Sequence, residues 1–297
     1  MAIEKFSKYI DYKNKKYVNY TGKKILILGY GSVGQAILPI VLRHITSDAQ
    51  NITVLEKGEN EKKFNERNSK SSVRYVKKEI KRANLESTLS KYVDEGGFII
   101  DVSLNIGALD IIEWCLKHGV HYINTSLERW HDEPDETIPK LAERTLYHTH
   151  KEVRAMAEKY KGAATVVATH GANPGLVTHL TKRALLKLAD KKGIKHVVPT
   201  DKEGWAQLMK KVGVKVVHVA ERDTQMLGEP KEKNEFVNTW SCEGFWAEGR
   251  APAEMGWGTH EDTNPENGKA QGNTAYLFQP GVSVLDRKST RLNSSHT

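Results

Sequence analysis

The sequence predicts an α/β fold in which a doubly wound parallel sheet is followed by a second domain of α+β type. Three observations lead to this prediction. Short apolar segments alternate with helical patterns over the first half of the chain, and the first such segment runs directly into a glycine-rich turn. Beyond Asp190, segments with β character follow one another through shorter connections. Alternating strands and helices are typical of a parallel sheet, whereas consecutive strands are typical of an α+β domain.

The glycine-rich turn has the spacing Gly-x-Gly-x-x-Gly between the apolar segment 24–28 and a helical pattern over about 34–46. Its residues are Gly29, Tyr30, Gly31, Ser32, Val33 and Gly34. The first glycine permits a tight turn, the second leaves room for a pyrophosphate, and the third lets the helix pack closely on the strand. The helix N-terminus then offers N–H groups to the phosphates. The motif predicts a Rossmann-type domain that binds a dinucleotide, with a purely structural turn as the alternative.

The second apolar segment, 52–56, ends in Glu56. A carboxylate at this position can accept hydrogen bonds from both ribose hydroxyls of NAD, and it repels a 2′-phosphate. We therefore expect NAD as the cofactor. The alternative is that Glu56 is an ordinary surface charge at a strand end, and the adjacent Lys57 weakens the preference for NAD over NADP.

Polar residues follow the next strands of the predicted sheet. The expected strands are 24–28, 52–56, 73–77, 98–102 and 121–125, and the expected helices are about 34–46, 84–94, 105–119 and 138–160. Ligands bind outside the carboxyl ends of strands in such sheets. The candidates at these ends are Ser103, Asn105, Asn124, Thr125 and Glu128. Ser103 and Asn105 have helix capping as an alternative role, and Glu128 has that of an exposed loop residue.

A shaped turn follows the sixth apolar segment, 164–169. It contains Gly171, Asn173, Pro174 and Gly175, and a long helix begins at Leu176. Two glycines, a proline and an asparagine between a strand and a helix indicate a specific turn rather than a flexible linker. We expect the Asn173 side chain to be available near the crevice at the sheet edge.

The second half of the chain carries acidic and aromatic residues that suit a cationic ligand. Strands are expected at 214–224, 236–241 and 244–248. The stretch from Glu221 to Asp262 holds ten Asp or Glu residues and four Lys or Arg residues. Trp240, Trp246 and Trp257 lie in the same stretch. Trp in a strand usually belongs to a core or an interface, but beside carboxylates it can bind an ammonium group through a cation–π contact.

Composition excludes several classes of protein. The chain has 297 residues, a net charge of +8 and no apolar run of the ~20 residues that a membrane helix needs. Its basic residues alternate with Glu and Asn and lack interleaved aromatic residues, which argues against a nucleic-acid groove. The two cysteines, Cys115 and Cys242, lack metal-ligand spacing and fit a reducing compartment. We expect a cytoplasmic protein without a metal, and we expect Cys115 in the core.

Four motifs closely resemble bacterial homospermidine synthases, which belong to the saccharopine dehydrogenase-like superfamily. They are Gly29–Gln35 with the following Leu38-Pro39, then Gly171–Gly175, Ala220–Gln225 and Val237–Ser241. The resemblance covers about Lys23 to Leu285. It implies tightly held NAD, a Rossmann-type domain and a substrate domain that carries the interface of a homodimer. The predicted limits are 1–22 for a polar N-terminal extension, 23–175 for the NAD-binding domain and 176–285 for an incomplete substrate and dimerisation domain. The run 286–297 resembles a vector-derived tail, and the family has a further segment beyond it.

The resemblance also implies a reaction and its residues. Two putrescine molecules, or putrescine with spermidine, are converted to homospermidine with release of ammonia through an imine, and NAD takes up and returns one hydride. Glu221 and Glu248 would hold ammonium groups or move protons, Trp240 would stabilise a cationic intermediate, and Asn173 and Glu128 would orient the substrate amine. Gly171 would join the cofactor contacts. The alternatives are an oxidoreductase like saccharopine or carboxynorspermidine dehydrogenase, which needs a cationic clamp for carboxylates, and a nucleic-acid-binding or NAD-sensing protein.

Overall fold

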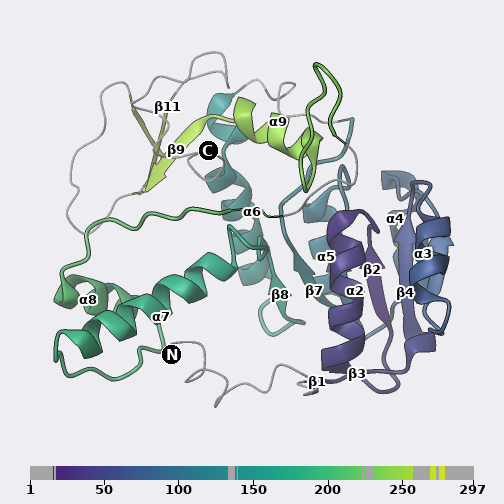
Figure 1. Cartoon of the computed structure of the whole chain (residues 1–297), viewed down its shortest axis with the longest axis horizontal. Coiled ribbons are helices and arrows are strands. Elements are labelled where there is room, and N and C mark those ends of the chain that lie inside the picture. Colours follow the sequence, from purple (N-terminus) through teal and green to yellow (C-terminus); the bar gives the residue numbers. More distant parts are fainter. Residues whose placement is uncertain are drawn as a thin grey trace. The chain divides into compact units, whose positions relative to one another are not determined.

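The computed structural model of the chain divides into two compact units (Figure 1). Unit 1 comprises Met1–Asp132 and Ala155–Thr169, and unit 2 comprises Glu133–Arg154 and His170–Thr297. Within them the structure describes residues 16, 18–132, 138, 140–222, 224, 230–256, 268–271 and 274–277. The predicted tail 286–297, Trp257 and most of the predicted N-terminal extension lie outside these described residues.

Unit 1 is built on a six-stranded parallel sheet with the order β5-β4-β2-β6-β7-β8. The strands are β2 Ile25–Leu28, β4 Ile52–Glu56, β5 Arg74–Lys77, β6 Phe98–Asp101, β7 His121–Asn124 and β8 Val166–Val167. All six strands expected from the apolar segments are present, although β8 is shorter than 164–169. Leu28 pairs with Leu55 on one side and with Asp101 on the other, and Asp101 pairs with Asn124. The carboxyl ends of these strands therefore meet along one edge of the sheet.

The helices of this part of the chain alternate with the strands, as a doubly wound sheet requires. They are α2 Ser32–His44, α3 Glu61–Asn68, α4 Leu85–Tyr92, α5 Ala108–His118 and α6 Leu146–Lys159, with short 3-10 turns at Ala49–Asn51, Arg82–Asn84 and Leu141–Arg144. The last of these helices, α6, runs across the boundary between the units. A two-residue pair, β1 Val18–Asn19 with β3 Ile45–Thr46, lies outside the main sheet. The helix over 61–68 was not predicted.

The core of unit 1 explains why the apolar segments become strands. Ile25, Ile27, Ile52, Val54 and Ile100 are each at most 4 % exposed, because helices cover both faces of a parallel sheet. Leu38 and Val41 of α2 pack against the same cluster. Full burial of such a side chain contributes about 1.5–3 kcal/mol. Cys115 is fully buried, as expected.

Unit 2 combines helices with a small antiparallel sheet, which is the α+β character that the sequence predicted. Its helices are α7 Leu176–Lys191, α8 Lys202–Val212 and α9 Cys242–Arg250. The sheet has the order β10-β11-β9, with β9 Ala253–Gly256, β10 Lys269–Gln271 and β11 Thr274–Leu277. A small core of Leu185, Ala189, Leu208 and Val212 joins α7 to α8.

The strands expected at 214–224, 236–241 and 244–248 are wrong over the part of those ranges that the structure describes. Residues 214–222 and 236–241 form no strand, and 242–250 form the helix α9. Residues 242–250 form a helix because Ser241 caps its N-terminus: the Ser241 side chain accepts a hydrogen bond from the Gly244 N–H at 2.8 Å. Helix α8, which was not predicted, has an N-cap of the same kind, in which the Asp201 side chain accepts a hydrogen bond from the Gly204 N–H at 2.7 Å. Its C-cap is Gly213, with φ of 76°.

Candidate functional site

The glycine-rich turn joins β2 to α2, and two of its glycines have no room for a side chain. Gly29 has φ of 93°, and a Cβ there would lie 2.8 Å from the carbonyl oxygen of Val102, the residue that follows β6. A Cβ on Gly34 would overlap the carbonyl oxygen of Gly29. Both residues must therefore be glycine for the helix to begin directly over the strands, as the motif predicted.

The middle of the glycine-rich turn, residues 31–33, is exposed and has free space beside its backbone. A Cβ on Gly31 would meet no atom within 4 Å among the described residues, and Gly31, Ser32 and Val33 are exposed. Gly31 is the N-cap residue of α2, and no side chain of the described residues caps the helix there. An uncapped helix N-terminus beside open backbone fits the pyrophosphate of a dinucleotide.

Glu56 fixes this turn from the neighbouring strand. One carboxylate oxygen accepts a hydrogen bond from the Tyr30 N–H at 2.5 Å, and the other accepts from the Gly58 N–H at 2.7 Å. The ring of Tyr30 is buried, with its centroid 5.1 Å from that of Phe64, and its hydroxyl accepts a hydrogen bond from Asn68. The Glu56 carboxylate is therefore hydrogen-bonded to the glycine-rich turn, which argues against the alternative of a solvated surface charge.

The candidates after β6 and β7 lie in unit 1, at the same sheet edge. Asn105 has a left-handed φ of 62°, and its carbonyl accepts a hydrogen bond from His131. Helix α5 begins at Ala108 with Gly107 as its N-cap, so the alternative in which Ser103 or Asn105 caps this helix is wrong. Thr125 is half-buried in a bend. Their contacts with a cofactor stay predictions.

Glu128 is half-buried in the loop after β7 rather than fully exposed. Its carboxylate accepts a hydrogen bond from the Ser126 hydroxyl at 2.7 Å, and its backbone carbonyl accepts one from the first residue of α5, Ala108. These bonds hold the loop against the helix. The role of Glu128 in orienting a substrate amine stays a prediction.

A buried chain of polar side chains crosses the same edge, and the sequence did not single out two of its members. The Tyr122 hydroxyl donates to Asp101 at 2.7 Å and accepts from the Asn124 amide at 3.0 Å. Asp101 also accepts from the Ser103 hydroxyl at 2.6 Å, and Asn124 accepts from the Thr169 N–H at 2.7 Å. Burial raises the pKa of Asp101, with the hydrogen bonds from Ser103 and Tyr122 acting in the opposite direction. Burial also raises the pKa of Tyr122, which keeps its hydroxyl as a donor.

The turn with Gly171 and Asn173 opens unit 2 and is closed on itself. The Gly171 N–H donates to the Pro174 carbonyl at 2.8 Å, and the Gly171 carbonyl accepts from the Leu176 N–H at 2.9 Å. Gly175 is buried with φ of 128°, and α7 begins at Leu176 as predicted. Asn173 is half-buried at the tip of this rigid turn.

The remaining candidates lie on two segments of unit 2. Trp240 is half-buried just before α9, where its ring lies 3.0 Å from the position of a Cβ on Gly244 and its centroid lies 6.3 Å from that of Phe245. Glu248 is exposed on α9, two turns further on, and Glu221 is exposed in the irregular segment that follows α8. Cys242, the first residue of α9, is exposed. The substrate roles of Trp240, Glu248 and Glu221 stay predictions.

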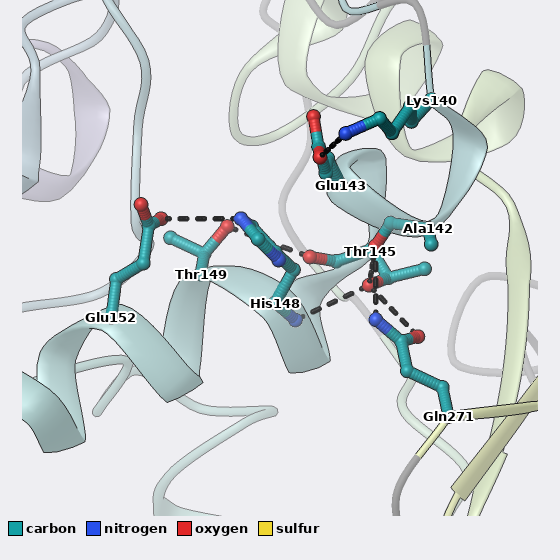
Figure 2. Close-up of polar contacts among 8 residues, drawn as sticks. All are labelled: Lys140, Ala142, Glu143, Thr145, His148, Thr149, Glu152 and Gln271. Atoms are coloured by element: carbon teal, nitrogen blue, oxygen red, sulfur yellow. Dashed lines mark hydrogen bonds and ion pairs between the residues drawn. The ribbon is translucent and has the colours of Figure 1, made fainter.

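A polar joint in unit 2 connects the small sheet to the start of α6 (Figure 2). Gln271 of β10 donates to the Ala142 carbonyl at 3.0 Å, and the Thr145 hydroxyl lies 3.2 Å from the Gln271 side-chain oxygen. Glu254 of β9 accepts hydrogen bonds from the Leu146 and Tyr147 N–H groups at 2.8 and 2.9 Å. A carboxylate on the free N–H groups of a helix start is favourable. Burial nevertheless raises the pKa of Glu254.

Two other kinds of site are absent from the described residues. In that part of the chain no helix is long and apolar enough to cross a membrane. The same residues hold no cluster of three or more His, Cys, Asp or Glu side chains that could bind a metal ion.

The sheet order, the glycine turn and the acidic residue at the end of β4 define a dinucleotide-binding unit of Rossmann type, attached to an α+β unit. A family model described as the saccharopine dehydrogenase NADP binding domain matches residues 25–167. A second, described as the saccharopine dehydrogenase C-terminal domain, matches residues 171–296. Two successive parts of the chain, which together make up most of it, are therefore similar to saccharopine dehydrogenases.

Two curated relatives and one solved structure are homospermidine synthases to which the chain is similar. Homospermidine synthase of Mesorhizobium japonicum is 40 % identical over 280 residues, which cover 91 % of this chain and 57 % of that protein. Homospermidine synthase of Blastochloris viridis is 37 % identical over 276 residues, covering 90 % and 57 %. The crystal structure of a Legionella pneumophila homospermidine synthase in complex with NAD matches with a TM-score of 0.74 at 33 % identity, over 89 % of this chain and 55 % of that one. The chain thus spans a little over half the length of these relatives.

Proposed function

We propose that this protein is an NAD-dependent homospermidine synthase. The observation that carries the proposal is homology to homospermidine synthases along both units, at 37–40 % identity over about nine-tenths of the chain. In unit 1 that homology includes a glycine turn whose geometry suits a dinucleotide. The proposed reaction joins two putrescine molecules into homospermidine and releases one ammonia, so that atoms balance without net oxidation.

The cofactor of the proposal is NAD. Gly31, Ser32 and the N-terminus of α2 would hold the pyrophosphate, and Glu56 would face the ribose at the end of β4. The negative charge of Glu56 beside the turn disfavours a 2′-phosphate, although the matching family model is described as NADP binding. The Legionella relative was solved with NAD. When bound, NAD supplies a hydride acceptor that is regenerated within each turnover.

The substrate side of the proposal rests on charge and on an aromatic ring. Putrescine carries two ammonium groups, and Glu221 and Glu248 supply carboxylates for them. Trp240 would stabilise a cationic intermediate through a cation–π contact, worth ~2 kcal/mol when desolvated. Asn173 and Glu128 would orient the reacting amine, since an amide and a carboxylate both accept its hydrogen bonds.

The partners and the location of the protein follow from this proposal. We propose a homodimer that acts in the cytoplasm on diamine and polyamine substrates, without nucleic acid or membrane. The basis is the similarity to homospermidine synthases.

A second candidate is an oxidoreductase that acts on an imine formed from an amino acid. The descriptions of both family models favour it. Substrates of that type carry carboxylates and need a clamp of Arg or Lys. The acidic composition of 221–262, with ten acidic and four basic residues, favours a diamine instead.

The deciding experiment is mass spectrometry of the protein incubated with isotope-labelled putrescine and NAD⁺. Labelled homospermidine without accumulating NADH is the expected result. The incubation is run with this chain and with a form extended to the length of its relatives, to separate the effect of chain length from that of chemistry. NADH formation with an amino acid substrate, and no homospermidine from a folded, NAD-bound extended form, would contradict the proposal and favour the oxidoreductase.

A further inference from the structure

A buried hydrogen-bond chain lies under the edge of the sheet where the glycine turn sits. Its members come from β6 and the two residues that follow it, from β7, and from Thr169, two residues after the end of β8. The strands β7 and β8 are labelled in Figure 1. Asp101, Tyr122 and Asn124 are 5 %, 1 % and 2 % exposed. Neither the glycine motif nor the substrate carboxylates of the proposed reaction use these side chains.

Each polar atom along this chain has a defined partner. One oxygen of Asp101 accepts from both the N–H and the hydroxyl of Ser103, at 3.0 and 2.6 Å, and its other oxygen accepts from the Tyr122 hydroxyl. The Tyr122 oxygen in turn accepts from the Asn124 amide nitrogen. The Asn124 amide oxygen accepts from the Thr169 N–H. A fully satisfied buried network of this kind fixes the positions of the groups at its ends.

One end of the buried hydrogen-bond network, at Ser103, lies against the glycine-rich turn. The Ser103 N–H that Asp101 holds lies 3.0 Å from the position of a Cβ on Gly29, and the Val102 carbonyl lies 2.8 Å from it. The backbone of 102–103 is therefore the wall against which the first glycine of the turn packs. A shift of Ser103 by a few tenths of an ångström would displace that wall and the turn with it, since interiors are close-packed.

The second end holds a backbone conformation that needs support. Thr169 has φ of 53°, which is unfavourable for a β-branched residue, and it is the last residue of unit 1. The Asn124 amide oxygen accepts its N–H at 2.7 Å. Strained residues of this type persist only where surrounding contacts determine them.

We propose that Asp101, Tyr122 and Asn124 act as positioning residues for the dinucleotide site, by holding Ser103 against the glycine turn at one end and Thr169 in its left-handed conformation at the other. The inference rests on the proposed NAD site and adds residues to it that bind no ligand themselves. It also gives Asn124 an indirect role, because both ends of its side-chain amide are occupied within the protein.

The test compares two Tyr→Phe variants of the full chain. Tyr122→Phe removes the central hydroxyl and leaves the ring in place. Tyr160→Phe is the matched control. It also removes a hydroxyl that donates to a carboxylate of unit 1, that of Glu113 at 2.8 Å, but this pair does not belong to the buried hydrogen-bond network. Hydrogen–deuterium exchange of the amides of Ser103 and Thr169 is measured together with the Kd for NAD.

We expect Tyr122→Phe to accelerate exchange at both amides and to raise the Kd for NAD roughly fivefold, the size of one net hydrogen bond. Tyr160→Phe should change neither value. Unchanged exchange at Ser103 and Thr169 in folded Tyr122→Phe would overturn the proposal, and so would faster exchange with an unchanged Kd. If the wild-type chain itself fails to bind NAD, the proposed cofactor fails, whereas the exchange data still decide whether the network holds its two ends.

A second variant covers the case in which Tyr122→Phe does not fold. Ser103→Ala removes only the hydroxyl arm at the half-buried end of the network and keeps the N–H bond to Asp101. We expect faster exchange of the backbone amide at the substituted position and a roughly twofold to threefold higher Kd for NAD, with exchange at Thr169 unchanged. Wild-type exchange and affinity in this variant would overturn the proposed role of the Ser103 end.

Discussion

The carboxylate of Glu56 accepts a hydrogen bond from the backbone N–H of Tyr30 at 2.5 Å, across 26 residues of sequence. Glu56, the last residue of β4, thus fixes Tyr30, the second residue of the glycine turn that follows the neighbouring strand β2. The same carboxylate accepts from Gly58 at its other oxygen. The position of the negative charge is therefore set by the backbone, at the end of the strand where the sequence predicts the contact with a dinucleotide ribose.

We expect Glu56→Gln to shift cofactor preference. Loss of the negative charge removes the repulsion of a 2′-phosphate, while the amide oxygen retains one of the two backbone hydrogen bonds. The Kd for NADP should fall relative to that for NAD by roughly tenfold, or about 1.4 kcal/mol. Fluorescence titration with both cofactors measures the ratio. Glu59→Gln, an exposed carboxylate paired with Lys77, is the control and should leave the ratio unchanged.

Two glycines of the same turn should respond to alanine in different ways. Gly34→Ala places a methyl group against the Gly29 carbonyl and should destabilise unit 1 by about 1–3 kcal/mol or more. Gly31→Ala meets open space and should leave the melting temperature close to that of the wild type. It should weaken NAD binding, because the methyl group would occupy the position proposed for the pyrophosphate. Thermal unfolding and NAD titration of both variants check this. Unimpaired NAD binding by Gly31→Ala would contradict the assigned phosphate position.

The stability contributed by Glu113 should depend on pH. The pKa of this carboxyl is lowered from 4.5 to about 2, first by its hydrogen bond with Lys159 and then by that with Tyr160. A lowered folded-state pKa means that the stabilisation is fully present above pH 4.5 and is lost as the pH falls towards 2. The ion pairs are partly exposed, so the contribution is modest.

Glu113→Gln tests this dependence by urea unfolding at about pH 7, 4 and 2.5. The variant should be less stable than the wild type at neutral pH, and the difference should shrink towards the most acidic condition. The control is Glu158→Gln, which changes an exposed carboxylate on the same stretch of α6 as Lys159. A difference that stays constant across these pH values would show that Glu113 does not act as an ionised partner.

Substitutions of Trp240 should separate its aromatic character from its role in structure. Trp240→Phe should keep part of the proposed synthase activity, because a smaller ring still presents a π face. Trp240→Ala should lose nearly all of it while NAD binding stays intact. Product formation from labelled putrescine, together with NAD titration, measures both effects. Equal activity in the two variants and the wild type would exclude the cation–π role.

Much of unit 1 could be predicted from the sequence, because buried parallel strands are continuous apolar segments that local composition reveals. The glycine turn was equally local, since its three glycines lie within six residues. Helix α3 was missed because its sequence, Glu-Lys-Lys-Phe-Asn-Glu-Arg-Asn, has one apolar residue and so shows no periodicity. Its helical form depends on Phe64 packing against Tyr30 and Tyr75, which is a tertiary effect.

Unit 2 was predicted in class but not in detail. Phe245 and Trp246 favour a strand by propensity, and the capping hydrogen bond of Ser241 makes the segment a helix instead. The buried network in unit 1 could not be predicted for a different reason. Asp101 and Tyr122 are 21 residues apart, and only the register of β6 with β7 brings their side chains together.

The two cysteines of the chain have a practical consequence for spectroscopy. Cys115 is fully buried, and burial raises the pKa of its thiol, so it forms little thiolate at neutral pH. Cys242 is exposed at the start of α9, two residues after Trp240. A maleimide dye added to the native protein should therefore label Cys242 selectively, without any engineered site. The fluorophore would sit close in sequence to Trp240, which is proposed to contact the substrate, so a change in its fluorescence on addition of putrescine would test the proposed diamine binding.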